Sequence, residues 1–146
     1  MTDNVIIIPT RLEAKRLPNK PLKKINNKEM ILHVYEAAKK ANVGEVIVAS
    51  PNKEIYDLIS SNNGICVKTE DTHNTGTDRI FEVFDKVLKK EPQTIINLQG
   101  DMPNIEPASI KMLCNYMQKK LCDIATLASE FKDKSAIENI NNVKVL

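Results

Sequence analysis

The sequence predicts an α/β fold with a mainly parallel sheet and helices on both of its faces. Short apolar runs alternate with longer segments whose apolar residues recur at helical spacing. The runs are too uniformly apolar to have one face in water, as expected for parallel strands covered on both sides. With 146 residues, 42% of them hydrophobic, the chain is expected to form a single domain over residues 1–146.

The spacing of apolar residues predicts the first strand and the first helix. The apolar run 5–8 predicts a buried strand, which Pro9 ends. Residues 30–42 then predict a helix, because apolar residues recur three and four positions apart, and His33 packs on the same face. Gly44 suits the end of this helix.

The same alternation continues through the middle of the chain. A second strand over 46–49 is followed by a helix over 52–62, whose apolar residues face one side. The dipeptide Asn63-Gly64 predicts a turn, and the short apolar run 65–67 predicts a third strand.

The remaining predicted helices and strands lie beyond a polar loop. The loop covers 69–77, and the next helix begins at about Asp78. The patterns beyond it predict a helix over 78–89, a strand over 94–98, a helix over 110–121, a strand over 124–127 and the start of a strand at 143–146.

The loop after the first strand is strongly basic. Between residues 9 and 24 it carries six positive charges against Glu13, a net charge of +5, whereas the whole chain carries only +2. Such folds hold phosphates at the carboxyl ends of their strands, and two prolines restrict the loop around its central lysine. The sequence therefore predicts a phosphate-binding loop with the cations Arg11, Lys15, Arg16, Lys20, Lys23 and Lys24.

Two further polar loops follow strands and should reach the same edge of the sheet. The loop 69–79 offers hydroxyls and amides that could bind a base or sugar, and Arg79 lies near the start of a helix. Asp101, with Gln99 beside it, follows a buried strand and suits a Mg²⁺ ion held by a carboxylate and substrate phosphates. The combination predicts a nucleoside triphosphate site without a Walker A or dinucleotide motif, neither of which occurs.

Each of these features also has a purely structural explanation. A basic loop can simply be solvated, Asp101 can be a turn or capping residue, and Asp78 can cap the helix that begins there. His73 is expected to be a loop residue rather than a base, because no acid that would orient it is evident. Only the joint pattern favours a functional interpretation.

Composition limits the other classes of partner. The positive charge is confined to one loop, which argues against nucleic acid as a partner. No apolar run is long enough for a membrane span, and the N-terminus lacks a signal-peptide pattern. The cysteines Cys66, Cys114 and Cys122 are expected to be small buried hydrophobes in a reducing cytoplasm.

The joint pattern resembles 3-deoxy-manno-octulosonate cytidylyltransferase, the CMP-Kdo synthetase family. Residues 8–22 read Ile-Pro-Thr-Arg-Leu-x-x-x-Arg-Leu-Pro-Asn-Lys-Pro-Leu, and residues 30–38 read Met-Ile-Leu-His-Val-Tyr-Glu-x-Ala. Thr-Gly-Thr-Asp-Arg at 75–79, Asn-Leu-Gln-Gly-Asp-Met-Pro at 97–103 and Asn-Val-Lys-Val-Leu at 142–146 follow in the family's order. The resemblance covers essentially the whole chain.

The resemblance implies a three-layer, Rossmann-like fold similar to nucleotide-diphospho-sugar transferases. It implies transfer of CMP from CTP to Kdo, giving CMP-Kdo and pyrophosphate for lipopolysaccharide biosynthesis in the cytoplasm. It also implies Mg²⁺ as the cofactor and a homodimer for the full-length family. Such transfer depends on positioning and charge neutralisation more than on covalent help from the protein.

The resemblance also assigns roles to individual residues. It implies that Arg11, Lys20 and Asp101 are catalytic and that Asp101 holds the metal. The nucleotide-binding residues that it implies are Pro9, Thr10, Arg11, Arg16, Lys20, Thr75, Gly76, Thr77, Asp78, Arg79 and Gln99. The family usually has Gly at position 19 and Glu at position 102, where this chain has Asn19 and Met102.

Family members continue beyond the length of this chain, so we expect a fold that is incomplete at its C-terminus. The resemblance leaves three alternatives to an active CMP-Kdo synthetase. The chain could be an inactive fragment, one half of a split enzyme, or another nucleotidyltransferase such as a CMP-sialate synthetase. The last lacks the Arg-Leu-Pro-x-Lys-Pro-Leu run and is the least favoured.

Overall fold

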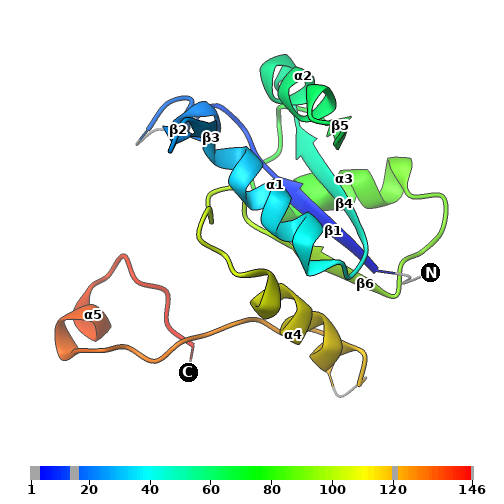
Figure 1. Cartoon of the computed structure of the whole chain (residues 1–146). Coiled ribbons are helices and arrows are strands. Elements are labelled where there is room, and N and C mark those ends of the chain that lie inside the picture. Colours follow the sequence, from blue (N-terminus) through cyan, green and yellow to red (C-terminus); the bar gives the residue numbers. More distant parts are fainter. Residues whose placement is uncertain (1–3, 14–16, 120–121, 146) are drawn as a thin grey trace.

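The core of the protein is a parallel sheet, as the sequence predicts, and it has four strands in the described part of the chain (Figure 1). The computed structural model describes residues 4–13, 17–119 and 122–145. The strand order β5-β4-β1-β6 places the first strand in the interior of the sheet. The four strands are β1 (Asn4–Pro9), β4 (Glu45–Ser50), β5 (Ile65–Lys68) and β6 (Thr94–Asn97).

β1 is buried over its whole length because it has a strand on each side and a layer of helices on each face. Ile7 is in register with Ile47 of β4 on one side and with Asn97 of β6 on the other. Fully burying an isoleucine side chain contributes about 1.5–3 kcal/mol. The run of three isoleucines at 6–8 therefore fixes the strand that leads into the basic loop.

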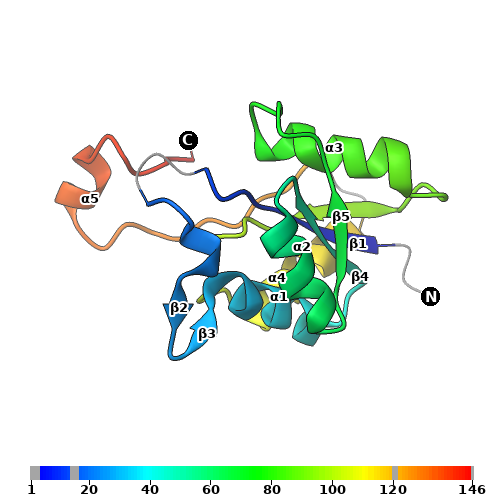
Figure 2. The ribbon, with the colours of Figure 1, turned by 90° about the horizontal axis from the view of Figure 1, so that it is seen from above.

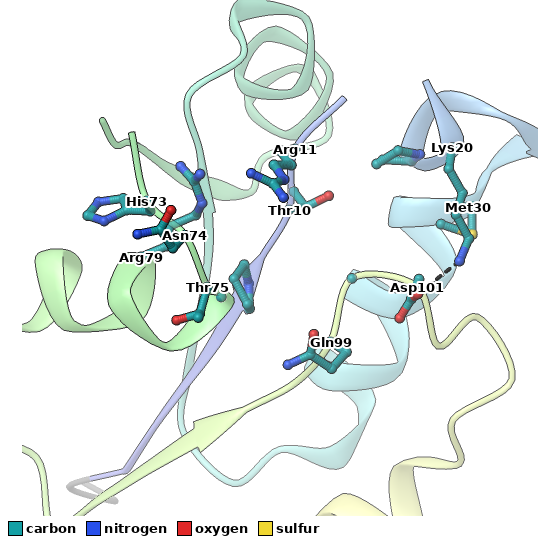
Figure 3. Close-up of a pocket in the computed structure, with 14 residues that line it drawn as sticks. Thr10, Arg11, Lys20, Met30, His73, Asn74, Thr75, Arg79, Gln99 and Asp101 are labelled. Atoms are coloured by element: carbon teal, nitrogen blue, oxygen red, sulfur yellow. Dashed lines mark hydrogen bonds and ion pairs between the residues drawn. The ribbon is translucent and has the colours of Figure 1, made fainter. Parts of the chain in front are cut away.

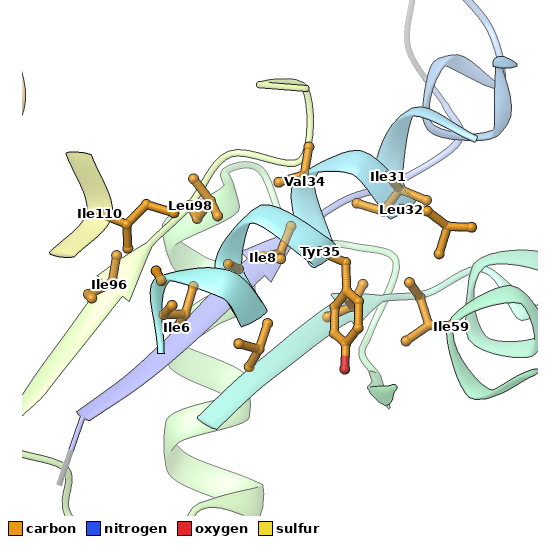
Figure 4. Packing of buried hydrophobic residues seen from close by; sticks show 14 of the residues in the cluster. Ile6, Ile8, Ile31, Leu32, Val34, Tyr35, Ile59, Ile96, Leu98 and Ile110 are labelled. Carbon is orange, nitrogen blue, oxygen red and sulfur yellow. The ribbon is translucent and has the colours of Figure 1, made fainter. Parts of the chain in front are cut away.

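Alternate residues of β1 face two separate hydrophobic clusters. Ile6 and Ile8 pack with α1 (Met30–Ala41), α2 (Lys53–Ser61) and α4 (Pro107–Met117), as Figure 4 shows for part of this cluster. On the opposite face, Val5 and Ile7, which alternate with them along the strand, pack against α3 (Gly76–Val87). The fold is thus a three-layer α/β sandwich, in agreement with the fold class that the sequence predicts.

α3 differs from the prediction at its start and on its inner face. It begins at Gly76, and Thr75 rather than Asp78 is the N-cap. Its buried apolar residues are Ile80 and Val83. The apolar spacing over 78–89 predicts Val87 on the same inner face, but this residue is 42% exposed. The cap was identifiable from the sequence, since Thr-x-x-Asp is the spacing of a capping box.

Three short elements in the basic loop and after it were not predicted. They are a 3₁₀ turn, η1 (Lys20–Leu22), and an antiparallel hairpin of β2 (Lys24–Ile25) and β3 (Lys28–Glu29). Asn26 and Asn27 form the hairpin turn with positive φ angles of 48° and 63°, which asparagine tolerates. His33 is half-buried and its Nε2 contacts the carbonyl oxygen of Ile25, so it fastens the hairpin to α1 rather than packing in the core.

The role expected for Gly44 was wrong. Asn42, with a φ of 51°, is the residue that ends α1 in the left-handed region. Gly44 is needed for a close approach, because a Cβ atom there would lie 2.1 Å from the carbonyl oxygen of Asn4. The glycine therefore lets the start of β4 lie against β1.

The two strands predicted near the C-terminus are absent. Residues 124–127 and 143–145 have no strand structure, and a short helix, α5 (Lys134–Glu138), lies between them. Figures 1 and 2 show that the chain beyond α4 leaves the layers of the sheet. An apolar run becomes a strand only where a neighbouring strand accepts its hydrogen bonds, and the described sheet ends at β6. Leu121 and Leu146 lie outside the described residues.

None of the helices found in the described part of the chain is long and apolar enough to cross a bilayer.

Candidate functional site

Three loops meet at the carboxyl edge of the sheet and enclose a cavity of about 250 Å³ (Figure 3). They are the loops that follow β1, β5 and β6, which the sequence predicts to converge. The structure brings together nine of the candidate site residues around this cavity. They are Pro9, Thr10, Arg11, Lys20, Thr75, Gly76, Arg79, Gln99 and Asp101.

Arg11 is held between two backbone hydrogen bonds that fix the start of the basic loop. The N–H of Thr10 donates to the carbonyl of Ala49, 3.0 Å away, and the N–H of Leu12 donates to Asn52 Oδ1 at the same distance. Asn52 precedes α2, so the loop is fastened to both β4 and α2. This arrangement lets Arg11 face the cavity from a fixed backbone.

Lys20 reaches the cavity from a turn that begins at Asn19. Asn19 has a φ of 57° and a ψ of 24°, and its N–H donates to the carbonyl of Leu12. This left-handed conformation favours glycine and tolerates asparagine. It therefore explains why Asn19 can stand where the resembled family usually has glycine.

Arg79 lies at the cavity wall but is also tied to its own loop. Its Nη1 donates to Thr69 Oγ1 and to the carbonyl of Glu70, 2.8 Å away, and the residue is 3% exposed. Burial lowers the pKa of the Arg79 guanidinium, and the positive charge of Arg11 lowers it further. A buried guanidinium and an exposed one, those of Arg79 and Arg11, thus line the same cavity, and their mutual repulsion favours an anion between them.

Thr75 and Asp78 form a reciprocal capping box at the start of α3. Thr75 Oγ1 accepts from the Asp78 N–H at 3.1 Å, and Asp78 Oδ2 accepts from the Thr75 N–H at 3.0 Å. The Thr75 hydroxyl also donates to Asp78 Oδ2 at 2.7 Å, and this bond, followed by the one from the Thr75 N–H, lowers the pKa of the Asp78 carboxyl. Asp78 and Thr77, which the resemblance assigns to nucleotide binding, do not line the cavity.

Asp101 lies across the cavity from the two arginines and is bonded to Lys20. The distance from Lys20 Nζ to Asp101 Oδ2 is 2.8 Å, and the two side chains are 36% and 56% exposed (Figure 3). Gln99 is oriented by a 2.8 Å hydrogen bond from its Nε2 to Asn97 Oδ1. The loop after β6 therefore presents one carboxylate and one amide to the cavity.

Gly100 allows this third loop to lie against the first. A Cβ atom at position 100 would be 3.1 Å from both the Pro9 carbonyl oxygen and Thr10 Cβ. Any larger residue would push the two loops apart. The glycine thus helps to set the separation between Arg11 and Asp101.

The cavity has the donors for only part of a metal shell. Within the described ranges, no group of three or more His, Cys, Asp and Glu side chains is placed to hold an ion. Asp101 supplies one carboxylate, and the side-chain oxygens of Thr10, Thr75 and Gln99 belong to residues elsewhere in the same lining. Mg²⁺ commonly uses one or two carboxylates and takes its remaining ligands from phosphates and water, so this donor set fits Mg²⁺ that arrives with a phosphate ligand.

Several residues of the site were not predicted. Met30 and His73 also line the cavity, as does Asn74, whose amide belongs to the loop predicted to bind a base or sugar. Glu82, which was not predicted either, bonds to His73 from α3 at 2.5 Å. The His73–Glu82 spacing of nine residues crosses a loop and a helix turn, so no local pattern signals it. Arg16, predicted as a phosphate ligand, lies outside the described residues.

The charges around the cavity favour a polyanion. Arg11, Arg79 and Lys20 line it with a single carboxylate, that of Asp101. The planar guanidinium groups suit phosphate oxygens, and the exposed Lys20–Asp101 pair is weak enough to rearrange. The arrangement can therefore bind an elongated phosphate group and neutralise its charge.

Comparison with known proteins gives a consistent set of matches. A family model described as "Cytidylyltransferase" matches residues 5–146. A 3-deoxy-manno-octulosonate cytidylyltransferase of Rhodopseudomonas palustris is 39% identical over 146 residues, covering 99% of this chain and 60% of that protein. The protein of the same name from Actinobacillus succinogenes is 36% identical, covering 100% of this chain and 56% of that protein.

A solved structure supports the same likeness. It is described as CMP:2-keto-3-deoxy-manno-octonic acid synthetase complexed with CTP, and it matches with a TM-score of 0.74 and 42% identity. The match covers 80% of this chain and 47% of that one. The chain thus spans about half to three fifths of the length of the proteins it resembles.

Proposed function

The chain belongs to the cytidylyltransferase family, and from this premise we propose that it binds CTP in the cavity between its three loops. We propose further that it serves the transfer of CMP to 3-deoxy-D-manno-octulosonate (Kdo), giving CMP-Kdo and pyrophosphate for lipopolysaccharide biosynthesis in the cytoplasm. The observation that carries the proposal is the meeting of Arg11, Lys20, Arg79 and Asp101 at one cavity. The relatives' names supply the sugar.

The triphosphate is the part of CTP that the cavity accommodates best. Arg11 and Arg79 would bind phosphate oxygens from one side, and Lys20 would do so from the other by exchanging Asp101 for phosphate. Because the Lys20–Asp101 pair is exposed, breaking it costs about 0–1 kcal/mol. Each charge-assisted hydrogen bond to phosphate contributes about 1.5–3 kcal/mol, so the exchange is favourable.

Asp101 is the proposed ligand for Mg²⁺, together with oxygens of the bound triphosphate. When bound, the ion would neutralise charge on the phosphates and favour departure of pyrophosphate. The Lys20–Asp101 pair would separate on ligand binding. The Asp101 carboxylate would then hold Mg²⁺, and the Lys20 ammonium group would bind phosphate. Thr75, Gln99 and Asn74 are the polar side chains that could bind the sugar or base.

The proposed reaction needs no covalent intermediate with the protein. The anomeric hydroxyl oxygen of Kdo attacks the α-phosphorus of CTP, and the bond from that phosphorus to the bridging oxygen of the β-phosphate breaks. Pyrophosphate and the hydroxyl proton leave. Positive charge from Arg11 and Lys20 would stabilise the phosphates as the bond breaks.

A second candidate function is nucleotide binding without transfer. It is favoured by one observation, that the charged lining of the cavity suits a triphosphate, whereas only the relatives' names supply Kdo. CTP binding and CMP-Kdo synthesis are therefore separate measurements. We also propose the homodimer that the resemblance implies for the full-length family.

The test combines calorimetry with a product assay. The chain is titrated with CTP, ATP and CMP in the presence of Mg²⁺, and CMP-Kdo formation is followed by ³¹P NMR after addition of Kdo. We expect CTP to bind more tightly than ATP and CMP, and Arg11→Met to weaken CTP binding at least ~10-fold. Lys40→Met, which removes an exposed charge from α1, should have no effect.

The outcomes separate the two candidate functions. CTP binding with CMP-Kdo formation supports the transferase, and CTP binding without product supports nucleotide binding alone. Equal affinity for CTP and ATP, or no loss in Arg11→Met, would contradict a cytidine triphosphate site at this cavity.

A further inference from the structure

Glu82 lies in the middle of α3, and its carboxylate faces the neighbouring loop rather than water. The side chain is only 10% exposed. Its Oε2 atom accepts a hydrogen bond from the backbone N–H of Glu70 at 2.9 Å and contacts His73 Nε2 at 2.5 Å. Its Oε1 atom accepts from Lys86 Nζ at 3.1 Å. A single carboxylate thus holds two points of the loop that follows β5.

The charge state of Glu82 fixes the direction of the bond to His73. Burial alone would raise the pKa of the Glu82 carboxyl, but hydrogen bonds from His73, the Glu70 backbone and Lys86 outweigh it and lower the pKa to about 2. An ionised carboxylate can only accept hydrogen bonds. His73 Nε2 therefore carries a proton and donates it, which fixes the orientation of the ring.

The segment held in this way includes part of the cavity wall. His73, Asn74 and Thr75 follow one another along the chain, and all three line the cavity (Figure 3). Glu82 holds the segment at His73, and the capping box with Asp78 holds it at Thr75. The intervening Asn74 is thus placed between two attachments to the same helix.

α3 itself is fixed to the sheet that carries the other half of the site. Ile80 and Val83, on either side of Glu82, pack against residues of β1 and β4. β1 leads directly to Arg11. The carboxylate of Glu82 therefore sets the position of the loop wall relative to the basic loop across the cavity.

We propose that Glu82 is a positioning residue, which holds His73 and the backbone of Glu70 so that the 73–75 wall meets the nucleotide in a fixed geometry. The role rests on the proposed function, because the nucleotide is the occupant of that cavity. Glu82 itself does not line the cavity, so it acts through His73 and the loop. A fixed wall lowers the cost of ordering the site when ligand binds.

The experiment uses the full chain with Glu82→Gln, His73→Gln, the double variant and Asp85→Asn as the matched control. Asp85→Asn removes the same charge from an exposed position of the same helix. Three quantities are measured for each protein. They are the dissociation constant for CTP with Mg²⁺, the melting temperature, and the hydrogen-exchange rates of the 73–75 amides without nucleotide.

We expect each single variant to weaken CTP binding about 10-fold and the double variant to lose no more than one single variant does. Residues that act through one contact give such non-additive losses. The exchange of the loop amides should accelerate in the same three variants, whereas Asp85→Asn should match the parent protein. A ¹⁵N spectrum should show a signal for the His73 Nε2–H group in the parent protein. We expect that signal to weaken or disappear in Glu82→Gln.

Two results would overturn the proposal. One is a Glu82→Gln variant with a lower melting temperature but unchanged CTP affinity, since Glu82 would then serve only the stability of α3. The other is losses that add fully in the double variant. If the parent chain binds no cytidine nucleotide, the proposed function fails, and loop exchange alone decides. Faster exchange in Glu82→Gln than in Asp85→Asn supports positioning, and equal exchange contradicts it.

Discussion

Lys20 Nζ lies 2.8 Å from Asp101 Oδ2, so the proposed phosphate ligand and the proposed metal ligand are bonded to each other. The two residues are 81 positions apart in the sequence and come from the first and third loops of the site. Both side chains are more than a third exposed, so their mutual attraction is weak. The pair keeps two charged groups close together while leaving both able to exchange partners.

Lys20→Ala should weaken CTP binding by about 1.5–3 kcal/mol, because a charge-assisted hydrogen bond to phosphate is lost. CMP has one phosphate, and its affinity should change much less. Calorimetry of both nucleotides makes the comparison, with Lys39→Ala, which removes an exposed lysine from α1, as the control. Equal losses for CTP and CMP would place Lys20 away from the β- and γ-phosphates.

Asp101→Asn should abolish the effect of Mg²⁺ on CTP affinity, because the amide is a far weaker metal ligand than the carboxylate. In an enzyme that carries this segment, turnover should fall at least ~100-fold. Glu106→Gln removes an exposed charge a few residues away and should leave both quantities unchanged. A Mg²⁺ titration that is the same in Asp101→Asn and the parent chain would exclude Asp101 as the ligand.

Asn19 should tolerate glycine but not a β-branched residue, because its φ is 57°. Asn19→Gly keeps the turn that presents Lys20, so CTP affinity should stay within about twofold of the parent. Asn19→Val should lower the free energy of unfolding by about 1–2 kcal/mol and weaken CTP binding. Denaturation and calorimetry test both variants. Identical behaviour of the two would show that the turn is not retained in solution.

The stability of the protein should depend on pH through Glu82. The folded-state pKa of this carboxyl is about 2, against an ordinary value of 4.5, owing to the contacts with His73, Lys86 and the Glu70 backbone. Because the pKa is lowered on folding, the stabilisation is present above about pH 4.5 and disappears as the pH falls toward 2. It amounts to at most roughly 3 kcal/mol.

Urea denaturation of the parent chain and Glu82→Gln between pH 6 and pH 2.5 measures this contribution. The difference in the free energy of unfolding should be largest at pH 6 and shrink as the pH falls, since a protonated Glu82 resembles glutamine. A difference that stays constant over this range would show that the Glu82 charge does not stabilise the fold.

The sequence by itself determined the parallel α/β architecture and the three loops that meet at the site. Uniformly apolar runs such as 5–8 and 46–49 can be buried only as interior strands, and helical spacing places the covering helices between them. In a parallel sheet the loops that follow these strands meet at one edge. The order of strands and loops along the chain is therefore enough to assign Arg11, Lys20 and Asp101 to one cavity, which all three residues line.

Only the tertiary structure decided which contacts these side chains make. Arg79 is fastened to Thr69 and Glu70 at the wall of the cavity, and Asp78 serves the helix cap instead of facing the cavity. The pairs His73–Glu82 and Lys20–Asp101 join different elements, so no local spacing announces them. The apolar run 124–127 is not a strand because pairing depends on a neighbour in space. Local sequence specifies backbone preference and burial, but a contact between distant residues exists only when the whole fold brings them together.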